Sequence, residues 1–84
     1  MKDFDKSGPG WAAFGDYYAF TKKYWEPPEQ FSEEYWDGFE ADMKAFIKKH
    51  KDLDHRYIEG LTVPLIRRLE RIEHERRDKA NGIG

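Results

Sequence analysis

The chain contains no cysteine among its 84 residues. This absence excludes disulfide bonds, a thiol nucleophile and the cysteine-ligated classes of zinc and iron–sulfur sites. The chain also lacks any apolar run near the roughly 18 residues that a membrane-spanning helix needs. Its polar start, MKDFDKSGPG, has no apolar core of the kind that a signal peptide carries. We therefore expect no membrane association, and a place in the cytoplasm of the cell that makes the protein.

Side chains that could carry out catalysis are few. Serine and threonine occur at only four positions, Ser7, Thr21, Ser32 and Thr62. None of the four lies in the glycine-flanked turn that exposes a catalytic serine. His74 and Glu75 begin a run like the zinc motif HExxH, but Asp78 replaces its second histidine. We expect no catalytic site, no metal site and no cofactor, and therefore a protein that is not an enzyme.

Aromatic residues are abundant instead, with six Phe, five Tyr and three Trp. Each ring can bury roughly 150–250 Å², so a few of them can form the core of a short chain. Their helical spacing and the net charge of only −2 favour a folded chain over a disordered one. We expect a single helical domain over residues 10–80, with a flexible lead over 1–9 and a tail over 81–84.

The first helix is predicted at about residues 11–25. Its apolar side chains at steps of three and four form one stripe, which we expect to face the core: Trp11, Phe14, Tyr18, Thr21 and Trp25. Gly15 lies inside this helix, where it would allow another helix or a ring to come close. Pro27 and Pro28 end the helix, because proline disfavours the helical conformation in the residue before it.

The second helix is predicted at 33–50. Ser32 is a favourable N-cap, and Phe31 and Trp36 then occupy the two positions of a hydrophobic staple. We expect Trp25 and Trp36 to close the mouth of a helical hairpin as core residues. The neighbouring tyrosines, Tyr24 and Tyr35, are one position off each stripe and are expected to be displayed.

The third region can be divided in two ways. Its apolar stripe runs through both Gly60 and Pro64: Ile58, Leu61, Leu65, Leu69 and Ile72. One interpretation is a single long kinked helix; the other is a helical turn at 53–59, a break at Gly60 and a helix at 63–79. We prefer the second, because Pro64 then falls in a first turn, where its missing N–H costs little. The expected fold is all-α, with a third helix packed across the hairpin.

Charge is unevenly distributed. Residues 1–43 carry a balance of −6 and residues 44–84 a balance of +4. Seven acidic residues lie within 24–43, with no Lys or Arg among them. This run is either a solvated face that pairs with the basic half, or an acidic surface that meets a basic partner. Direct nucleic-acid binding is not expected, because glutamates interrupt the arginines of the last helix and the isoelectric point is about 5.9.

The aromatic residues outnumber those that a small core needs, and tyrosine and tryptophan are enriched at binding hot spots. We therefore expect a protein-binding surface that combines acidic, aromatic and arginine side chains. Its candidate residues are Tyr24, Glu29, Glu33, Tyr35, Asp37, Glu40, Arg67 and Arg71.

The segments GWAAFGDYYAFTKKYWEPPEQFSEEYWDGFEADMKAFIKKHK and PLIRRLERIEHE resemble a group of short proteins encoded in prophages of Firmicutes. The resemblance covers roughly residues 10–75. It rests on Gly10-Trp11, Asp16-Tyr17-Tyr18, Lys22-Lys23-Tyr24, Tyr35-Trp36 and Phe46. The stretch 52–60 is longer than the link usual in that group. The group has no assigned activity, so the resemblance implies only a context, a small accessory protein in the cytoplasm of a bacterial host.

Two functions follow as hypotheses. In the first, the chain is a non-enzymatic prophage protein that binds another protein. A sharper version makes it an inhibitor of a basic, nucleic-acid-binding defence protein of the host, whose phosphate groove the acidic residues would occupy. In the alternative, the chain is an assembly protein that forms a homodimer through its spare aromatics and its oppositely charged halves.

Overall fold

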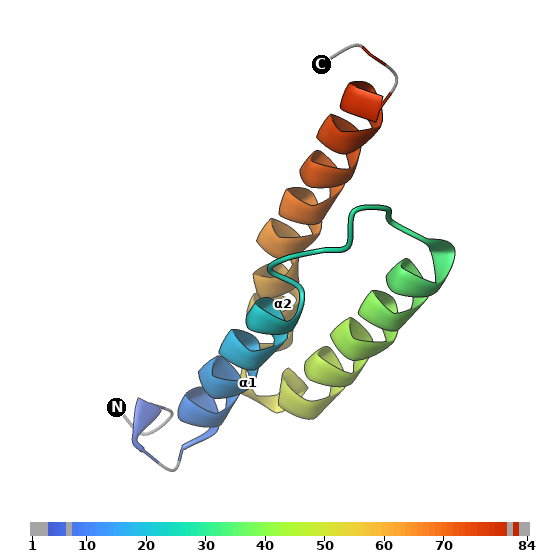
Figure 1. Cartoon of the computed structure of the whole chain (residues 1–84). Coiled ribbons are helices and arrows are strands. Elements are labelled where there is room, and N and C mark those ends of the chain that lie inside the picture. Colours follow the sequence, from blue (N-terminus) through green and yellow to red (C-terminus); the bar gives the residue numbers. More distant parts are fainter. Residues whose placement is uncertain (1–3, 7, 81, 83–84) are drawn as a thin grey trace.

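The computed structural model describes residues 4–6, 8–80 and 82, and over this part the chain is all-helical, with no strand. It contains two helices, α1 (Pro9–Lys23) and α2 (Glu33–Ala80), joined by a loop over residues 24–32 (Figure 1). The predicted lead over 1–9 and the tail over 81–84 lie partly outside the described residues.

A bend at Asp54 divides α2 into a first arm, residues 33–53, and a second arm, residues 55–80. Asp54 has extended backbone angles (φ −171°, ψ 100°) within the otherwise helical run. Its Oδ1 accepts a hydrogen bond from the backbone N–H of Tyr57 at 3.1 Å, so Asp54 is the N-cap of the second arm. Leu53 and Ile58 then occupy the staple positions, and both belong to one apolar cluster.

The predicted place of the break before the last helix is therefore wrong. The helix does not break at Gly60; it runs through Gly60 and Pro64, and the turn away from the first arm lies six residues earlier. A proline inside a helix costs about 3 kcal/mol, because it removes one backbone hydrogen bond and crowds the preceding turn. Burial of Leu65 and Leu69 on the same arm stabilises the helix across this point.

The predicted start of α2 is confirmed. Ser32 Oγ accepts a hydrogen bond from the backbone N–H of Tyr35 at 3.0 Å. The rings of Phe31 and Trp36 stack with centroids 5.5 Å apart, as a hydrophobic staple requires. The sequence signals for this helix N-terminus thus act between residues that are close in the chain.

The core lies between α1 and the two arms of α2. One cluster of buried residues consists of Phe20, Tyr24, Phe39, Leu65 and Leu69, and a second consists of Ala13, Phe46 and Ile58. Figure 1 shows α1 beside the bent α2, whose C-terminal end extends beyond α1. The described molecule is accordingly elongated, with principal extents of 52 × 21 × 19 Å.

The core-facing side of α1 differs from the predicted one. The buried residues of this helix are Gly10, Ala13 and Phe20, and Tyr24 follows them directly after the helix. Phe20 packs between Phe39 and Phe46, with ring centroids 5.3 and 5.9 Å away. The expected stripe is largely exposed instead. Both sides of α1 carry aromatics at helical spacing, and contacts with α2 select the side that includes Phe20.

Candidate functional site

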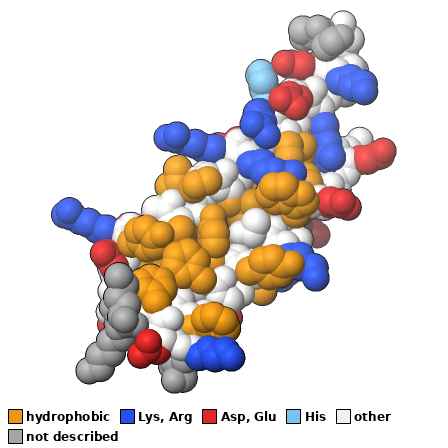
Figure 2. All heavy atoms as spheres, turned by 90° about the vertical axis from the view of Figure 1, so that its left-hand side faces the viewer, with side chains coloured by type: hydrophobic (Ala, Val, Ile, Leu, Met, Phe, Trp, Pro, Cys, Tyr) orange, Lys and Arg blue, Asp and Glu red, His pale blue; other side chains and the backbone are white. Residues whose placement is uncertain are grey.

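The feature of the described surface that stands out is a group of exposed aromatic side chains, which we call the aromatic face. Its members are Phe4 (50 % exposed), Trp11 (57 %), Phe14 (37 %), Tyr18 (69 %), Trp25 (50 %) and Tyr57 (50 %). Figure 2 looks at the side of the molecule on which α1 lies and shows hydrophobic side chains gathered across it, with Lys and Arg at the edges. Large apolar side chains of this kind are normally buried.

Most of the aromatic face comes from one regular stripe on α1, which we call the seam. It consists of Trp11, Phe14, Tyr18, Thr21 and Trp25. Steps of three and four residues place these side chains along one line, the pattern by which one helix packs against another in a coiled coil. The N–H of Trp25 donates to the carbonyl of Lys22 at 3.3 Å, which extends the line past the last helical residue.

At one end of the seam, three segments of the chain bring their rings together. Phe14 lies 5.9 Å from Phe4 and 6.2 Å from Tyr57, measured between ring centroids. Tyr57 comes from the second arm of α2 and Phe4 from the segment before α1. The aromatic face is therefore wider here than α1 alone would make it.

At the other end, Arg68 covers Trp25. The guanidinium lies 3.5 Å from the centroid of the indole ring, and its Nη1 donates to the Trp25 carbonyl at 2.7 Å. A groove beside this pair runs between α1 and the second arm and is lined in part by Tyr17, Thr21 and Pro64. The aromatic face thus ends at Arg68, whose guanidinium is stacked on the Trp25 ring.

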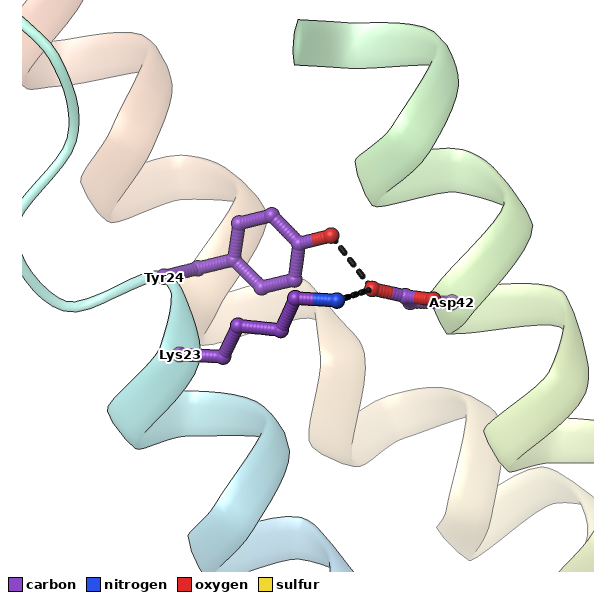
Figure 3. A network of polar contacts seen from close by, with 3 residues as sticks. All are labelled: Lys23, Tyr24 and Asp42. Carbon is purple, nitrogen blue, oxygen red and sulfur yellow. Dashed lines mark hydrogen bonds and ion pairs between the residues drawn. The ribbon is translucent and has the colours of Figure 1, made fainter.

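The two tyrosines that were expected to be displayed are not displayed. Tyr24 is only 6 % exposed, and its hydroxyl donates to Asp42 Oδ2, which also accepts from Lys23 Nζ at 2.7 Å (Figure 3). Burial, and after it the hydrogen bond to Asp42, raises the pKa of Tyr24. Tyr35 is half-buried, packs edge-on against Tyr24, and has a buried hydroxyl without a partner among the described residues.

The roles of the two tryptophans differ from the prediction in one case. Trp36 is half-buried, and its Nε1 donates to Glu73 Oε2 at 3.2 Å, which ties the first arm to the second. Trp25 is half exposed, so its assignment to the core was wrong. Sequence spacing places both tryptophans on stripes but does not say which stripe becomes buried.

The predicted acidic residues are all exposed, but they do not lie on the aromatic face. Glu40 pairs with Lys44 at 2.8 Å, and this hydrogen bond lowers the pKa of Glu40. Glu29, Glu33 and Asp37 make no ion pair with any residue that the structure describes. They lie on or just before the first arm, away from the seam.

Among the arginines, the predicted pair is exposed, and a different pair has a structural role. Arg67 makes no side-chain hydrogen bond or ion pair with the described residues, and Arg71 Nε lies 3.9 Å from Glu75 Oε1. Arg68 binds Trp25, and Arg76 donates to the carbonyl of Pro27 at 3.3 Å and to that of Pro28. No local pattern in the sequence signals these long-range bonds, because they join residues more than 40 positions apart.

A polar cluster between α1 and the first arm is the best candidate for titratable chemistry. Asp16 Oδ2 lies 2.8 Å from Lys49 Nζ and 2.7 Å from His50 Nε2. The hydrogen bond from Lys49, and after it that from His50, lowers the pKa of Asp16. Because one carboxylate oxygen accepts from two donors of the first arm, the cluster joins α1 to that arm. Within residues 4–6, 8–80 and 82, no group of three side chains could ligate a metal.

Comparison with models of known protein families, with curated proteins and with solved structures found no match to the chain. Neither α1 nor α2, the two helices of the described residues, has the length and hydropathy of a membrane span.

Proposed function

We propose that the chain is a non-enzymatic protein-binding module that acts by presenting its aromatic face to a protein partner in a bacterial cytoplasm. The observation that supports this function is the exposure of six large rings on one side of the molecule, four of them on the seam. Tryptophan and tyrosine dominate binding hot spots because they combine a large rigid surface with a polar edge.

The size of the aromatic face fits this function. With each ring more than a third exposed, the six together leave on the order of 600 Å² of aromatic surface in water. The largest apolar patch on a typical monomer is about 300–600 Å² and is often a binding site. A patch at the upper end of that range, on a chain of only 84 residues, favours an interaction surface.

A second candidate uses the acidic residues, with the prophage context that the sequence resemblance implies. Glu29, Glu33 and Asp37 are exposed and without counter-ions among the described residues, so they could meet a basic groove. In this version the chain inhibits a nucleic-acid-binding defence protein of the host. Unchanged binding to such a basic protein after Glu33→Lys, Asp37→Lys and Glu40→Lys would exclude it.

Capture from a bacterium that co-expresses a tagged and an untagged copy of the chain tests the first proposal. The untagged copy allows self-association and binding of another protein to be seen in one experiment. A variant of the face, Trp11→Ser with Tyr18→Ser, is compared with a matched variant of the acidic residues, Glu33→Ser with Asp37→Ser.

We expect the captured polypeptides, identified by mass spectrometry, to be lost with the face variant and kept with the acidic variant. Both variants change only exposed residues, so their helical circular dichroism should match that of the wild type. Equal capture by both variants, or no capture by the wild type, would overturn the proposal.

A further inference from the structure

We infer that the partner that covers the seam is α1 of a second copy of this chain, packed antiparallel across a two-fold axis near Tyr18. This inference rests on the proposed function, because it names the occupant of the same aromatic face. Four features of the described residues carry it: the symmetry of the seam, the area available, the charge beside the seam, and the open space at Gly15.

The seam is symmetric about its own centre. Trp11 and Trp25 are each seven residues from Tyr18, so reversing the helix direction places a tryptophan opposite a tryptophan. In a two-fold interface the same patch must fit itself, and this spacing lets Trp11 of each copy meet Trp25 of the other. Side chains spaced by seven residues also stay on one side of a helix that packs against another.

The surface area is large enough for a stable dimer. The six rings of the aromatic face leave on the order of 600 Å² in water. A standard interface takes about 800 Å² from each partner, and the aromatic face with its rim can supply that area.

Charge beside the seam does not oppose a second copy. Asp16 and Lys23 point toward the first arm of α2, where they bind Lys49 and Asp42 respectively. That leaves Lys22 as the charged side chain of α1 nearest the seam. Two copies can therefore approach along α1 without placing rows of like charge opposite each other.

The antiparallel direction follows from the two ends of the face. A parallel pair would bring both Arg68 side chains, and both Lys22 side chains, to the same end, where like charges repel. The antiparallel pair separates them. It also places the Arg68–Trp25 end of one copy beside the partner copy's ring cluster, where a cation on an aromatic surface is favourable.

Gly15 supports a close approach at this place. A Cβ atom built on Gly15 would have nothing within 4 Å, so the glycine is not required by any contact inside the described molecule. A glycine within a helix nevertheless costs about 1 kcal/mol relative to alanine. Beside the seam, it lets a second helix come nearer to the α1 backbone than any other residue would.

Sedimentation velocity of the full chain over a wide range of concentration tests the dimer. We expect a dimer mass at the upper concentrations for the wild type. Tyr18→Arg places two positive charges near the two-fold axis and should raise the dimer dissociation constant by roughly 30-fold or more, as loss of a hot spot does. Ala41→Arg, an exposed position on the first arm, is the matched control and should leave the dissociation constant unchanged.

A mixture of Tyr18→Arg and Tyr18→Glu chains checks that Tyr18 faces its own counterpart. We expect the mixture to regain the dimer that neither variant forms well alone, because opposite charges then meet across the axis. A wild type that remains monomeric, or a Tyr18→Arg chain that dimerises as tightly as Ala41→Arg, would overturn the inference.

The direction of packing is tested by cross-linking, which the absence of cysteine makes simple. With a short bismaleimide, Gly15→Cys chains mixed with Lys22→Cys chains should cross-link to each other more than either does to itself. Preferential self-cross-linking of both variants would indicate a parallel pair and contradict the antiparallel arrangement.

The capture experiment separates this inference from the proposed function. If the untagged copy is not retained but another protein is, and the face variant loses it, the second copy is the wrong occupant and the protein-binding function stands. If the chain is monomeric and nothing captured depends on the face, both are wrong.

Discussion

Arg68 and Trp25 lie 43 residues apart in the sequence but form the closest cation–aromatic pair of the described structure, with 3.5 Å between the guanidinium and the ring centroid. The same guanidinium donates to the Trp25 carbonyl at 2.7 Å. The pair joins the segment after α1 to the second arm of α2. Arg76 acts in the same way on Pro27 and Pro28, so two arginines hold the loop to one helix.

Arg68→Ala should lower the free energy of unfolding by about 1–2 kcal/mol, the combined loss of a stacked cation and a charged hydrogen bond in a partly exposed position. Arg68→Lys should recover only part of this, since an ammonium donates but does not stack as a planar guanidinium does. Urea denaturation measures the free energy of unfolding of both variants. Arg67→Ala, the exposed neighbour, should stay within about 0.5 kcal/mol of the wild type. Identical midpoints for the two alanine variants would show that the pair contributes nothing.

The assignment of the two sides of α1 can be checked with one residue from each. Phe20→Ala should cost about 3–5 kcal/mol, because it leaves a cavity between the rings of Phe39 and Phe46. Tyr18→Ala, in dilute solution where the chain is monomeric, should change stability by no more than about 0.5 kcal/mol. If Tyr18→Ala instead lowers the stability more than Phe20→Ala in thermal unfolding, the seam is the side of α1 that faces the core.

Stability should fall at acid pH in a way that depends on two carboxylates. The hydrogen bond from Lys23, and after it that from Tyr24, lowers the pKa of Asp42, and Lys49 does the same for Asp16. A lowered folded-state pKa contributes stability above the unfolded value, about 3.9, and that contribution disappears as pH falls through the folded value.

We therefore expect the wild type to lose stability below about pH 4, and Asp42→Asn and Asp16→Asn each to flatten that loss. Both ion pairs are more than a third exposed to solvent, so each should contribute less than about 1 kcal/mol. Denaturant titrations at a series of pH values measure the slope. Wild-type and Asp42→Asn curves with the same slope would contradict a role for Asp42.

Asp54→Ala should destabilise the chain by about 1 kcal/mol, because it removes the acceptor for the N–H of Tyr57 at the start of the second arm. Asp54→Asn or Asp54→Ser should retain most of the stability, since both can still accept that bond. Asp52→Ala, an exposed acid two residues earlier, is the control. Equal midpoints for Asp52→Ala and Asp54→Ala would mean that the cap is energetically neutral.

Gly38→Ala should stabilise the chain by about 0.5–1 kcal/mol. A Cβ at position 38 would have nothing within 4 Å, and the residue lies inside the first arm, so alanine gains helix propensity without a clash. For a chain of this size the melting temperature should rise by several degrees. A lower melting temperature would indicate that Gly38 has a contact that the structure does not show.

Local signals in the sequence were sufficient for the start of α2. Ser32 and its staple of Phe31 and Trp36 act within a few residues, so the sequence alone determines that start. The end of α1 was predicted less well, because the helix ends at Lys23, two residues before the predicted end and four before Pro27. The cap at Asp54 is also local. Leu53 and Ile58 give it the same staple pattern, which could have been found from the sequence and was hidden by the stronger signals of Gly60 and Pro64.

Only the tertiary structure decided which side of α1 became core. Two aromatic stripes on that helix have the same period, and periodicity cannot rank them. Contacts with Phe39 and Phe46 on the first arm choose the side with Phe20, and the bond to Asp42 buries Tyr24. The all-helical class, the charge asymmetry and the excess of aromatics were determined by the sequence itself, because they depend on composition and near neighbours. The exposure of the seam depends on distant contacts, so no reading of α1 alone could decide it.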